Sequence, residues 1–306
     1  CKLAAIRARL DTMWPRSVRV LFLAVSLGLT CALDFFSKLA SSTNGIKPPN
    51  VVIAPAQFGV PKDYDSIVAA LKARGHKKVI PAPLTRFDWL KITPSLATKE
   101  YWQGTLEPMP TLQFFYQALD KAFQEATVDS EEVSILAHSI GGWVARSYVA
   151  ERNYTVRKIV TLGTPHVASN KIDQTRGLVD FINKNYPADE RLTSVVGNTS
   201  TASSLDDLLA KKIWDSEISR SPLLESLVAL PSYSVLADTT NPFEIRGDGL
   251  IPIKSTILPE PARTLVIDET HHSGFIPTVF DSIILPDTYE WYGSPSKIEL
   301  WAPALL

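Results

Sequence analysis

The chain has 306 residues, a formal net charge of −1 and 45% apolar residues, which is the composition of an ordinary globular protein. It has no basic stripe, so nucleic acid is not an expected partner. Its histidines and cysteines do not show the spacing of a metal-binding motif, so neither a metal nor a cofactor is expected.

The first 44 residues differ from the rest of the chain. Basic residues precede a run of 14 residues without a charge, from Val20 to Leu33. A bilayer span needs about 20 apolar residues. The apolar core of a targeting signal needs roughly 7–15. We therefore expect residues 1–44 to be a targeting or membrane-anchor segment with a linker, or alternatively a buried helix, and residues 45–306 to form one domain.

Short apolar runs alternate with amphipathic segments along that domain. Strands are predicted at Asn50–Ala54, Lys78–Ile80, Val133–Ala137, Lys158–Leu162, Tyr233–Leu236 and Thr264–Ile267. Helices are predicted at Asp63–Arg74, at Thr111–Ala126, from Ile140 onward and at Ser273–Ile284, whereas Leu84–Pro110 is expected to be irregular and aromatic. This alternation predicts an α/β fold with a doubly wound, mostly parallel sheet covered on both faces.

The composition changes from about Ser169 to Pro231. Asp and Lys become frequent, and amphipathic segments appear without strand runs. A helix is predicted at Ser204–Ile213, which begins with a sequence like a capping box. We interpret residues 169–231 as a helical cap insertion, the alternative being an ordinary surface excursion.

The segment around Ser139 has the pattern of a nucleophile elbow. A predicted strand ends in Ala137, and Ser139 is followed by Ile140 and two glycines at the start of a helix. In such an elbow the serine occupies a strained turn between strand and helix, and its neighbours must be small. Ala137 stands where the usual Gly-x-Ser-x-Gly pattern has its first glycine.

A serine nucleophile needs a base and an acid, which follow it in the order acid, then histidine, in this arrangement. His271 and His272 come directly after the last predicted strand, and His272 is preferred with His271 as the alternative. Asp248 lies between two glycines and is the preferred acid. Asp238 is the second choice, and Asp268 is too close to the histidines in sequence.

Two backbone N–H groups are expected to hold the developing oxyanion. One belongs to Ile140, at the start of the helix after the elbow. The other belongs to the loop after the first strand, where Gln57 is preferred and Phe58 is the next choice. His138 and His166 are predicted to lie near the site without being required for the chemistry, and His166 is expected to be a hydrogen-bonding loop residue.

The segments Ala137–Arg146 and Val160–His166 resemble α/β-hydrolases of the lipase/esterase group, especially those with a GPI inositol-deacylase-like domain. They are most similar to uncharacterised plastid-type α/β-hydrolases of plants and algae. The shared stretches also include residues 86–90, 101–106, 173–178, 247–252 and 291–295. The resemblance implies Ser139 as nucleophile, Asp248 as acid and His272 as base. The chain departs from the family at Ala137 and at Ala56, where the family has glycine.

These observations together predict an α/β-hydrolase fold with a helical cap. The expected activity is hydrolysis of carboxylic esters with lipid-like acyl groups through an acyl-enzyme. The alternatives are a thioesterase or small-molecule acyl esterase, and a non-catalytic binding protein tethered to a membrane. The expected partner is an acyl ester or lipid substrate, with membrane association through the N-terminal segment. The expected location is the plastid, or alternatively the endoplasmic reticulum or secretory membrane, and the oligomeric state is left open.

Overall fold

The computed structural model describes residues 47–128, 132–168, 173–201, 232–237 and 245–306. The chain divides into two units, Cys1–Lys47 and Pro48–Leu306, and the second unit holds the fold described below. The predicted N-terminal segment 1–44 and the predicted helix Ser204–Ile213 lie outside the described residues. In the described part of the chain, no helix combines the length and the apolar character needed to cross a membrane.

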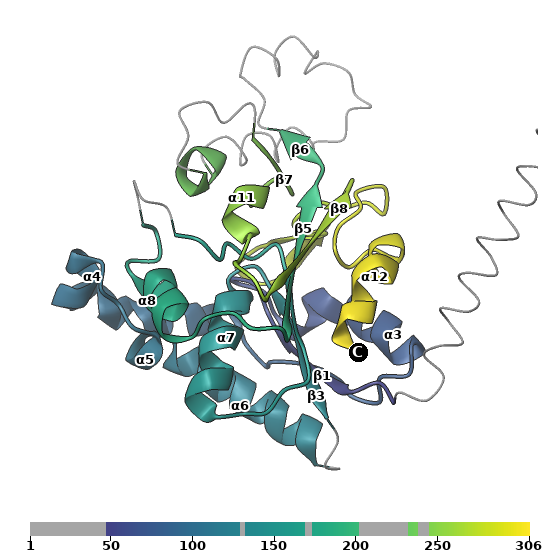
Figure 1. Cartoon of the computed structure of the whole chain (residues 1–306), viewed down its shortest axis with the longest axis horizontal. Coiled ribbons are helices and arrows are strands. Elements are labelled where there is room, and N and C mark those ends of the chain that lie inside the picture. Colours follow the sequence, from purple (N-terminus) through teal and green to yellow (C-terminus); the bar gives the residue numbers. More distant parts are fainter. Residues whose placement is uncertain (1–46, 129–131, 169–172, 202–231, 238–244) are drawn as a thin grey trace, which may run out of the picture. The chain divides into compact units, whose positions relative to one another are not determined.

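The second unit is built on a sheet of six parallel strands (Figure 1). The strand order is β2-β1-β3-β4-β5-β8, and every neighbouring pair is parallel. The strands span Asn50–Ala54 (β1), Val79–Pro81 (β2), Val133–His138 (β3), Ile159–Leu162 (β4), Leu192–Asn198 (β5) and Arg263–Asp268 (β8). The predicted parallel sheet is therefore confirmed, and the C-terminal ends of these strands all lie at one edge.

Helices cover both faces of this sheet. Alternate residues of β1 face opposite sides, so Val52 packs into one apolar cluster and Val51 into the other. One face is covered by α6 (Gln113–Thr127), α7 (Gly141–Arg152) and α8 (Leu178–Asn185). The opposite face is covered by α3 (Asp65–Ala73) and α12 (Pro295–Trp301). Both faces of β1 and β3 are buried, which explains why their sequences are mostly apolar and do not alternate with polar residues.

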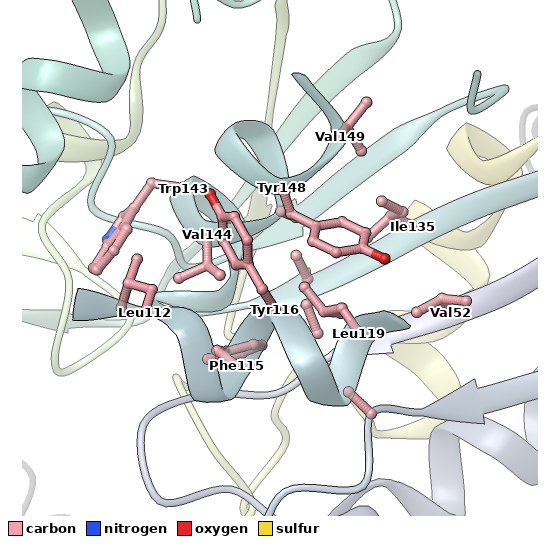
Figure 2. Close-up of a cluster of buried hydrophobic side chains, with 14 of the residues drawn as sticks. Val52, Leu112, Phe115, Tyr116, Leu119, Ile135, Trp143, Val144, Tyr148 and Val149 are labelled. Carbon is pink, nitrogen blue, oxygen red and sulfur yellow. The ribbon is translucent and has the colours of Figure 1, made fainter. Parts of the chain in front are cut away.

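The cluster between α6, α7 and the sheet contains large aromatic side chains. Figure 2 shows Tyr116 of α6 and Tyr148 of α7 beside Val144 and Ile135. The two tyrosine rings meet edge to face, with centroids 5.3 Å apart. This packing holds α7, the helix that follows the elbow, firmly against the sheet.

Shorter elements connect or extend this framework. The region predicted to be irregular contains η2 (Arg86–Ala97), α4 (Lys99–Gln103) and α5 (Pro108–Thr111). The remaining short helices are η1 (Pro61–Tyr64), α11 (Ile253–Thr256) and η4 (Ala302–Leu305). Two small antiparallel sheets pair β6 (Ser200–Thr201) with β7 (Arg246–Gly247), and β9 (Phe275–Pro277) with β10 (Ser282–Ile284).

Three predicted elements were wrong. The region Ser169–Pro231 was expected to lack strands, yet it contains β5, an internal strand of the sheet whose apolar run is interrupted by Thr193 and Ser194. Ser194 is fully buried, and its hydroxyl is satisfied there because it donates to the Thr256 carbonyl at 2.9 Å. The rest of the predicted cap, residues 202–231, lies outside the described residues.

In the other two errors, a strand was predicted where the structure has a helix, and a helix where it has strands. Tyr233–Leu236 lies in a helical segment over residues 232–236. The prediction was wrong because a short, mostly apolar segment fits a strand or a helix equally well. The predicted helix Ser273–Ile284 is instead the β9–β10 hairpin. Its turn is closed by Thr278, whose N–H and hydroxyl both donate to the Asp281 carbonyl, at 2.8 and 2.6 Å.

Candidate active site

The predicted site residues gather where the parallel strands end. Ser139 directly follows β3, Gly163 follows β4, and His272 follows β8 by a short loop. Asp248 packs against the end of β5, since a Cβ added to Gly197 would lie 2.9 Å from the Cβ of Asp248. Ligands of open parallel sheets bind at this carboxyl edge.

Ser139 lies in a strained elbow between β3 and α7. Its φ is +54°, a left-handed conformation that is uncommon outside glycine. Three hydrogen bonds hold it there. The Ser139 N–H donates to the Leu162 carbonyl at 2.8 Å, and the Ser139 carbonyl accepts from the Thr164 hydroxyl at 2.7 Å and the Gly142 N–H at 3.1 Å. Such strain persists only where the surroundings impose it, and it is typical of nucleophile elbows.

The two glycines after the elbow are required by close contacts. A Cβ on Gly141 would lie 2.5 Å from the Ala54 carbonyl oxygen and 2.7 Å from that of Pro55. A Cβ on Gly142 would lie 2.2 Å from the hydroxyl of Thr164. The glycine pair therefore lets the loop after β1 and the loop after β4 approach the first turn of α7.

Asp248 and His272 form a direct hydrogen-bonded pair. Nδ1 of His272 donates to Oδ2 of Asp248 over 2.7 Å, and the His272 N–H donates to the Asp248 carbonyl at 2.8 Å. The carboxylate is fully buried, whereas the imidazole keeps 10% of its side-chain surface exposed. Because Nδ1 is occupied, Nε2 is the nitrogen that this geometry leaves for proton exchange.

Every acceptor position of the buried Asp248 carboxylate has a donor. Oδ1 accepts the N–H groups of Ile251 at 2.7 Å and Leu250 at 3.1 Å. Oδ2 accepts the Tyr292 hydroxyl at 2.7 Å in addition to His272. Such a set of donors offsets the cost of removing a charged carboxylate from water.

The loop that carries Asp248 depends on its glycines. Gly249 has φ +94°, and a Cβ on Gly247 would lie 2.2 Å from the Ile251 carbonyl oxygen. The Gly249 N–H donates to the hydroxyl of Tyr233 at 2.9 Å. The predicted sharp turn around Asp248 is therefore present, and it closes on a tyrosine from a helix that the sequence did not predict.

Ser139 is joined to the Asp248–His272 pair through its neighbours. A Cβ on Gly163 would lie 2.5 Å from Asp248 Oδ2 and 2.8 Å from His272 Nδ1, so the strand end beside Ser139 contacts the pair directly. The rings of His138 and His272 lie 4.9 Å apart. Within the described residues the Ser139 hydroxyl makes no hydrogen bond, so a bond between Ser139 and His272 is not formed in this structure. Such bonds are often long before substrate binds.

The two predicted oxyanion donors border the same pocket as Ser139. Gln57 and Ile140 both line it, and in the described part of the chain neither backbone N–H donates to a protein acceptor. Phe58, the second choice, has φ +60° and packs its ring 5.7 Å from that of Trp89. The contact of Gly141 with the carbonyls of Ala54 and Pro55 brings this loop against the start of α7.

The alternative base and acids lie elsewhere. The His271 ring stacks on Tyr289 at 3.8 Å, and His272 is the histidine that pairs with Asp248. Asp268 accepts from the Asn198 amide at 2.6 Å. Asp238 lies outside the described residues.

His166 is a buried hydrogen-bonding residue, as predicted. Its Nε2 lies 3.0 Å from the Thr161 hydroxyl, and its carbonyl accepts the Asn183 amide at 2.8 Å. Burial, and then the nearby Arg146 guanidinium, lower the pKa of His166 well below its ordinary value. The imidazole is therefore neutral, and it does not contribute a charge to the site.

A pocket of about 480 Å³ opens over Ser139. Its wall is largely apolar and aromatic. Most of it comes from η2, α4, α7, α8 and the loop that follows Asp248, and the rest from the segments around Leu106, Leu112 and Leu236. The apolar lining residues are Trp89, Ile92, Leu96, Tyr101, Leu106, Leu112, Trp143, Leu178, Val179, Leu236, Leu250 and Ile251. A polar stretch, residues 173–176, lines one part of it. In the described residues, no group of three or more His, Cys, Asp or Glu side chains is placed to hold a metal.

Sequence reasoning missed the tyrosines that support the site. Tyr292 bridges Asp248 and the Gly197 N–H, which donates to its hydroxyl at 2.8 Å. Burial, followed by the adjacent Asp248 charge, raises the pKa of Tyr292 well above its ordinary value. Tyr292 stands within the stretch 291–295 that carried the family resemblance, and this was the one signal that pointed to it.

Comparison with known proteins gives one family match. A family described as PGAP1-like alpha/beta domain matches residues 109–230, about two fifths of the chain. The matched residues include Ser139 but end before Asp248 and His272. Among curated proteins, none matches the chain.

Several solved structures are similar at low sequence identity. Lipase BlEst2 from Bacillus licheniformis, in its mature form, is 14% identical with a TM-score of 0.48, over 85% of this chain and 92% of that one. Phospholipase PlaB from Legionella pneumophila is 10% identical with a TM-score of 0.45, over 84% and 59%. Dienelactone hydrolase from Anabaena variabilis is 13% identical with a TM-score of 0.39, over 84% and 85%.

The six-stranded parallel sheet, its flanking helices and the strained serine after β3 give the chain an α/β-hydrolase fold, as predicted. The match to the PGAP1-like alpha/beta domain agrees with the broader part of the predicted resemblance. The similarity to plastid-type hydrolases of plants and algae stays a prediction.

Proposed function

We propose that this protein is a serine hydrolase that cleaves carboxylic esters with lipid-like acyl groups. The observation that carries the proposal is the 2.7 Å bond between Asp248 and His272 at the sheet edge where the strained Ser139 borders a pocket. A fully buried carboxylate that orients one imidazole nitrogen leaves the other free to accept a proton. That is the requirement for activating a serine hydroxyl.

The proposed reaction has two steps. Ser139 Oγ attacks the ester carbonyl carbon while its proton passes to His272 Nε2. The backbone N–H groups of Gln57 and Ile140 bind the tetrahedral oxyanion. As the carbon–oxygen bond breaks, His272 gives the proton to the leaving alcohol, and an acyl-enzyme remains.

Water then completes the cycle. His272 takes a proton from water, which attacks the acyl carbon, and the collapse of the second intermediate releases the carboxylic acid and returns the proton to Ser139. Asp248 holds the imidazole tautomer and stabilises the transient imidazolium in both steps.

The pocket supports the substrate class. Its volume of about 480 Å³ is within the usual range for small-molecule sites, and its wall is mainly apolar. An acyl chain buries its methylenes favourably in such a pocket, at about 0.8 kcal/mol each. A thioesterase or small-molecule acyl esterase would use the same three side chains, so substrate profiles are needed to separate these activities.

Labelling with a fluorophosphonate probe tests the proposal. Wild type is expected to label, and Ser139→Ala is expected to lose both labelling and ester turnover. Ser147→Ala is the matched control, because Ser147 is a buried serine of α7 whose hydroxyl donates to helix carbonyls. A folded wild type that does not label would contradict catalysis and favour the binding-protein alternative.

Turnover of p-nitrophenyl esters of increasing chain length, beside acyl-CoA, tests the substrate class. A higher kcat/KM for long acyl esters than for acetate is expected from the apolar wall. Preference for acyl-CoA would identify a thioesterase, and preference for acetate a small-molecule esterase.

We also propose that residues 1–44 direct the chain to a membrane or organelle, with the plastid as first choice and the endoplasmic reticulum as alternative. The basic residues before the uncharged run Val20–Leu33 support this. Fractionation of cells that express the chain with and without residues 1–44 tests it. Equal distribution of both forms would contradict it.

A further inference from the structure

His138, the residue before Ser139, makes contacts on both sides of the site. Its Nδ1 lies 3.0 Å from the Tyr64 hydroxyl, and its Nε2 lies 2.9 Å from the His272 carbonyl oxygen. The side chain is buried, with 1% of the residue exposed. These contacts connect elements that lie far apart in sequence.

The chemistry of these groups sets the direction of every bond. The His272 carbonyl can only accept, so Nε2 of His138 carries a proton. Burial, and then the neighbouring His272, lower the pKa of His138 well below its ordinary value, so the ring is neutral and Nδ1 is an acceptor. The Tyr64 hydroxyl therefore donates to Nδ1, and its oxygen accepts the Ala56 N–H at 2.7 Å.

The result is one directed chain of hydrogen bonds. It runs from the Ala56 N–H through Tyr64 and His138 to the backbone of His272. Ala56 precedes Gln57, the expected oxyanion donor, and His138 precedes the nucleophile. We propose that His138 is a positioning residue. It fixes the positions of the loop that carries Gln57 and of the base His272 relative to the nucleophile Ser139.

This inference rests on the proposed function, but its structural part can be tested separately. A buried histidine with satisfied hydrogen bonds is common in protein cores, so the proposal needs a result that stability alone does not produce. Misplacement of a catalytic group by about 1 Å can cost about 100-fold in rate. A positioning role therefore predicts a loss of kcat with little change in KM.

Three substitutions of His138 test its two hydrogen bonds separately. His138→Asn places an amide near the position of Nδ1 and keeps the Tyr64 contact. His138→Gln reaches the position of Nε2 and keeps the His272 contact. His138→Leu keeps neither. We expect kcat to fall between about 10-fold and 100-fold in His138→Leu and less in the two amide variants.

Tyr64→Phe tests the same series of hydrogen bonds at the Ala56 end, because it removes the acceptor of the Ala56 N–H. We expect kcat to fall by about 10-fold with KM unchanged. His76→Gln and Tyr148→Phe are the controls. His76 is a buried histidine bonded to the Pro49 carbonyl at 2.7 Å, and Tyr148 is a buried tyrosine bonded to Asp120 at 2.8 Å. Both controls lose a comparable hydrogen bond outside the site, and their kcat is expected to stay at the wild-type value.

The downfield proton resonance of His272 Nδ1–H gives a readout that does not need activity. It is expected to shift or broaden in His138→Leu and His138→Asn, which both lose the His272 contact, with the larger change in the leucine variant. It is expected to change less in His138→Gln, which keeps that contact, and to stay unchanged in both controls. If His138→Leu does not fold, the amide variants and Tyr64→Phe decide the question.

A folded His138→Leu with wild-type kcat and an unchanged resonance would overturn the proposal. So would losses of kcat that follow the loss of thermal stability equally in variants and controls. Failure of the proposed function is recognised differently, as a wild type that neither labels with fluorophosphonate nor turns over esters. In that case the resonance alone still decides whether His138 positions His272.

Discussion

At the scale of single residues, the site contains a buried carboxylate, Asp248, and a strained backbone position, Ser139, and surrounding residues stabilise both. Asp248 is fully buried, yet two backbone N–H groups, a tyrosine hydroxyl and an imidazole surround its oxygens. Ser139 is held at φ +54° by hydrogen bonds to the end of β4, to the loop that follows it and to the first turn of α7. Neither state is favourable for an isolated chain, so each depends on its partners.

The strain at Ser139 leads to a stability prediction. We expect Ser139→Gly to be more stable than Ser139→Ala by about 1 kcal/mol, because glycine adopts a positive φ without steric cost. Both variants lack the hydroxyl, so the comparison isolates the backbone. The free energy of unfolding, from urea titration, is the measurement.

A pair of substitutions at Ser147, in the interior of α7, provides the control. There Ser147→Gly is expected to be less stable than Ser147→Ala by about 1 kcal/mol, the opposite sign, because the backbone is helical. If glycine were the less stable residue at both positions, the elbow would not be strained.

At the scale of elements, η2 forms part of the pocket wall and also an outer surface. Leu96 lines the pocket and is 45% exposed, whereas Leu90 of the same element is 63% exposed and is not part of the lining. The two leucines therefore differ in their relation to the pocket and not in their secondary structure. Substitution of each leucine by aspartate therefore separates the effect of a charge in the pocket from the effect of a charge elsewhere on the surface.

We expect Leu96→Asp to lower kcat/KM for long-chain esters by about 10-fold, because the charge opposes burial of methylenes at about 0.8 kcal/mol each. The effect on acetate esters is expected to be small. Leu90→Asp should leave both substrates unchanged. Equal losses for short and long esters in Leu96→Asp would place the acyl chain elsewhere.

At the scale of the whole molecule, buried histidines link folding to pH. Burial is the main cause that lowers the pKa of His76, His138 and His166. An unfolded chain protonates each of them near pH 6.5, whereas the folded protein does so only at lower pH. In that window the unfolded state binds more protons, so stability falls as pH decreases.

The free energy of unfolding is therefore expected to be constant above about pH 7 and to fall below about pH 6.5, by up to about 1.4 kcal/mol per pH unit for each histidine. Urea titrations between about pH 7 and pH 5 measure this slope. His166→Gln should reduce the slope by the contribution of one proton. An unchanged slope in this variant would show that His166 is not buried neutral.

Local patterns predicted most of the framework. The apolar runs of β1, β3, β4 and β8 and the helical spacing of α6 are properties of neighbouring residues, so the sequence contained them. Ser139 was predictable for the same reason, since strand, small residues and helix follow one another directly. The preference for His272 and Asp248 came from residue order and family resemblance, and the structure joins these two side chains.

The sequence by itself determined the alternation of strands and helices and the elbow. The spacing of apolar residues and the small size of the residues around Ser139 are patterns that a few neighbouring positions contain. Only the tertiary structure decided that β5 is an internal strand of the sheet, that Tyr292 and Tyr64 support the site, and that His138 connects two loops. The physical reason is that a polar residue in a strand, or a tyrosine in a loop, is stabilised by a partner distant in sequence. Ser194 with Thr256 and Tyr292 with Asp248 are such pairs, and no local pattern contains both members.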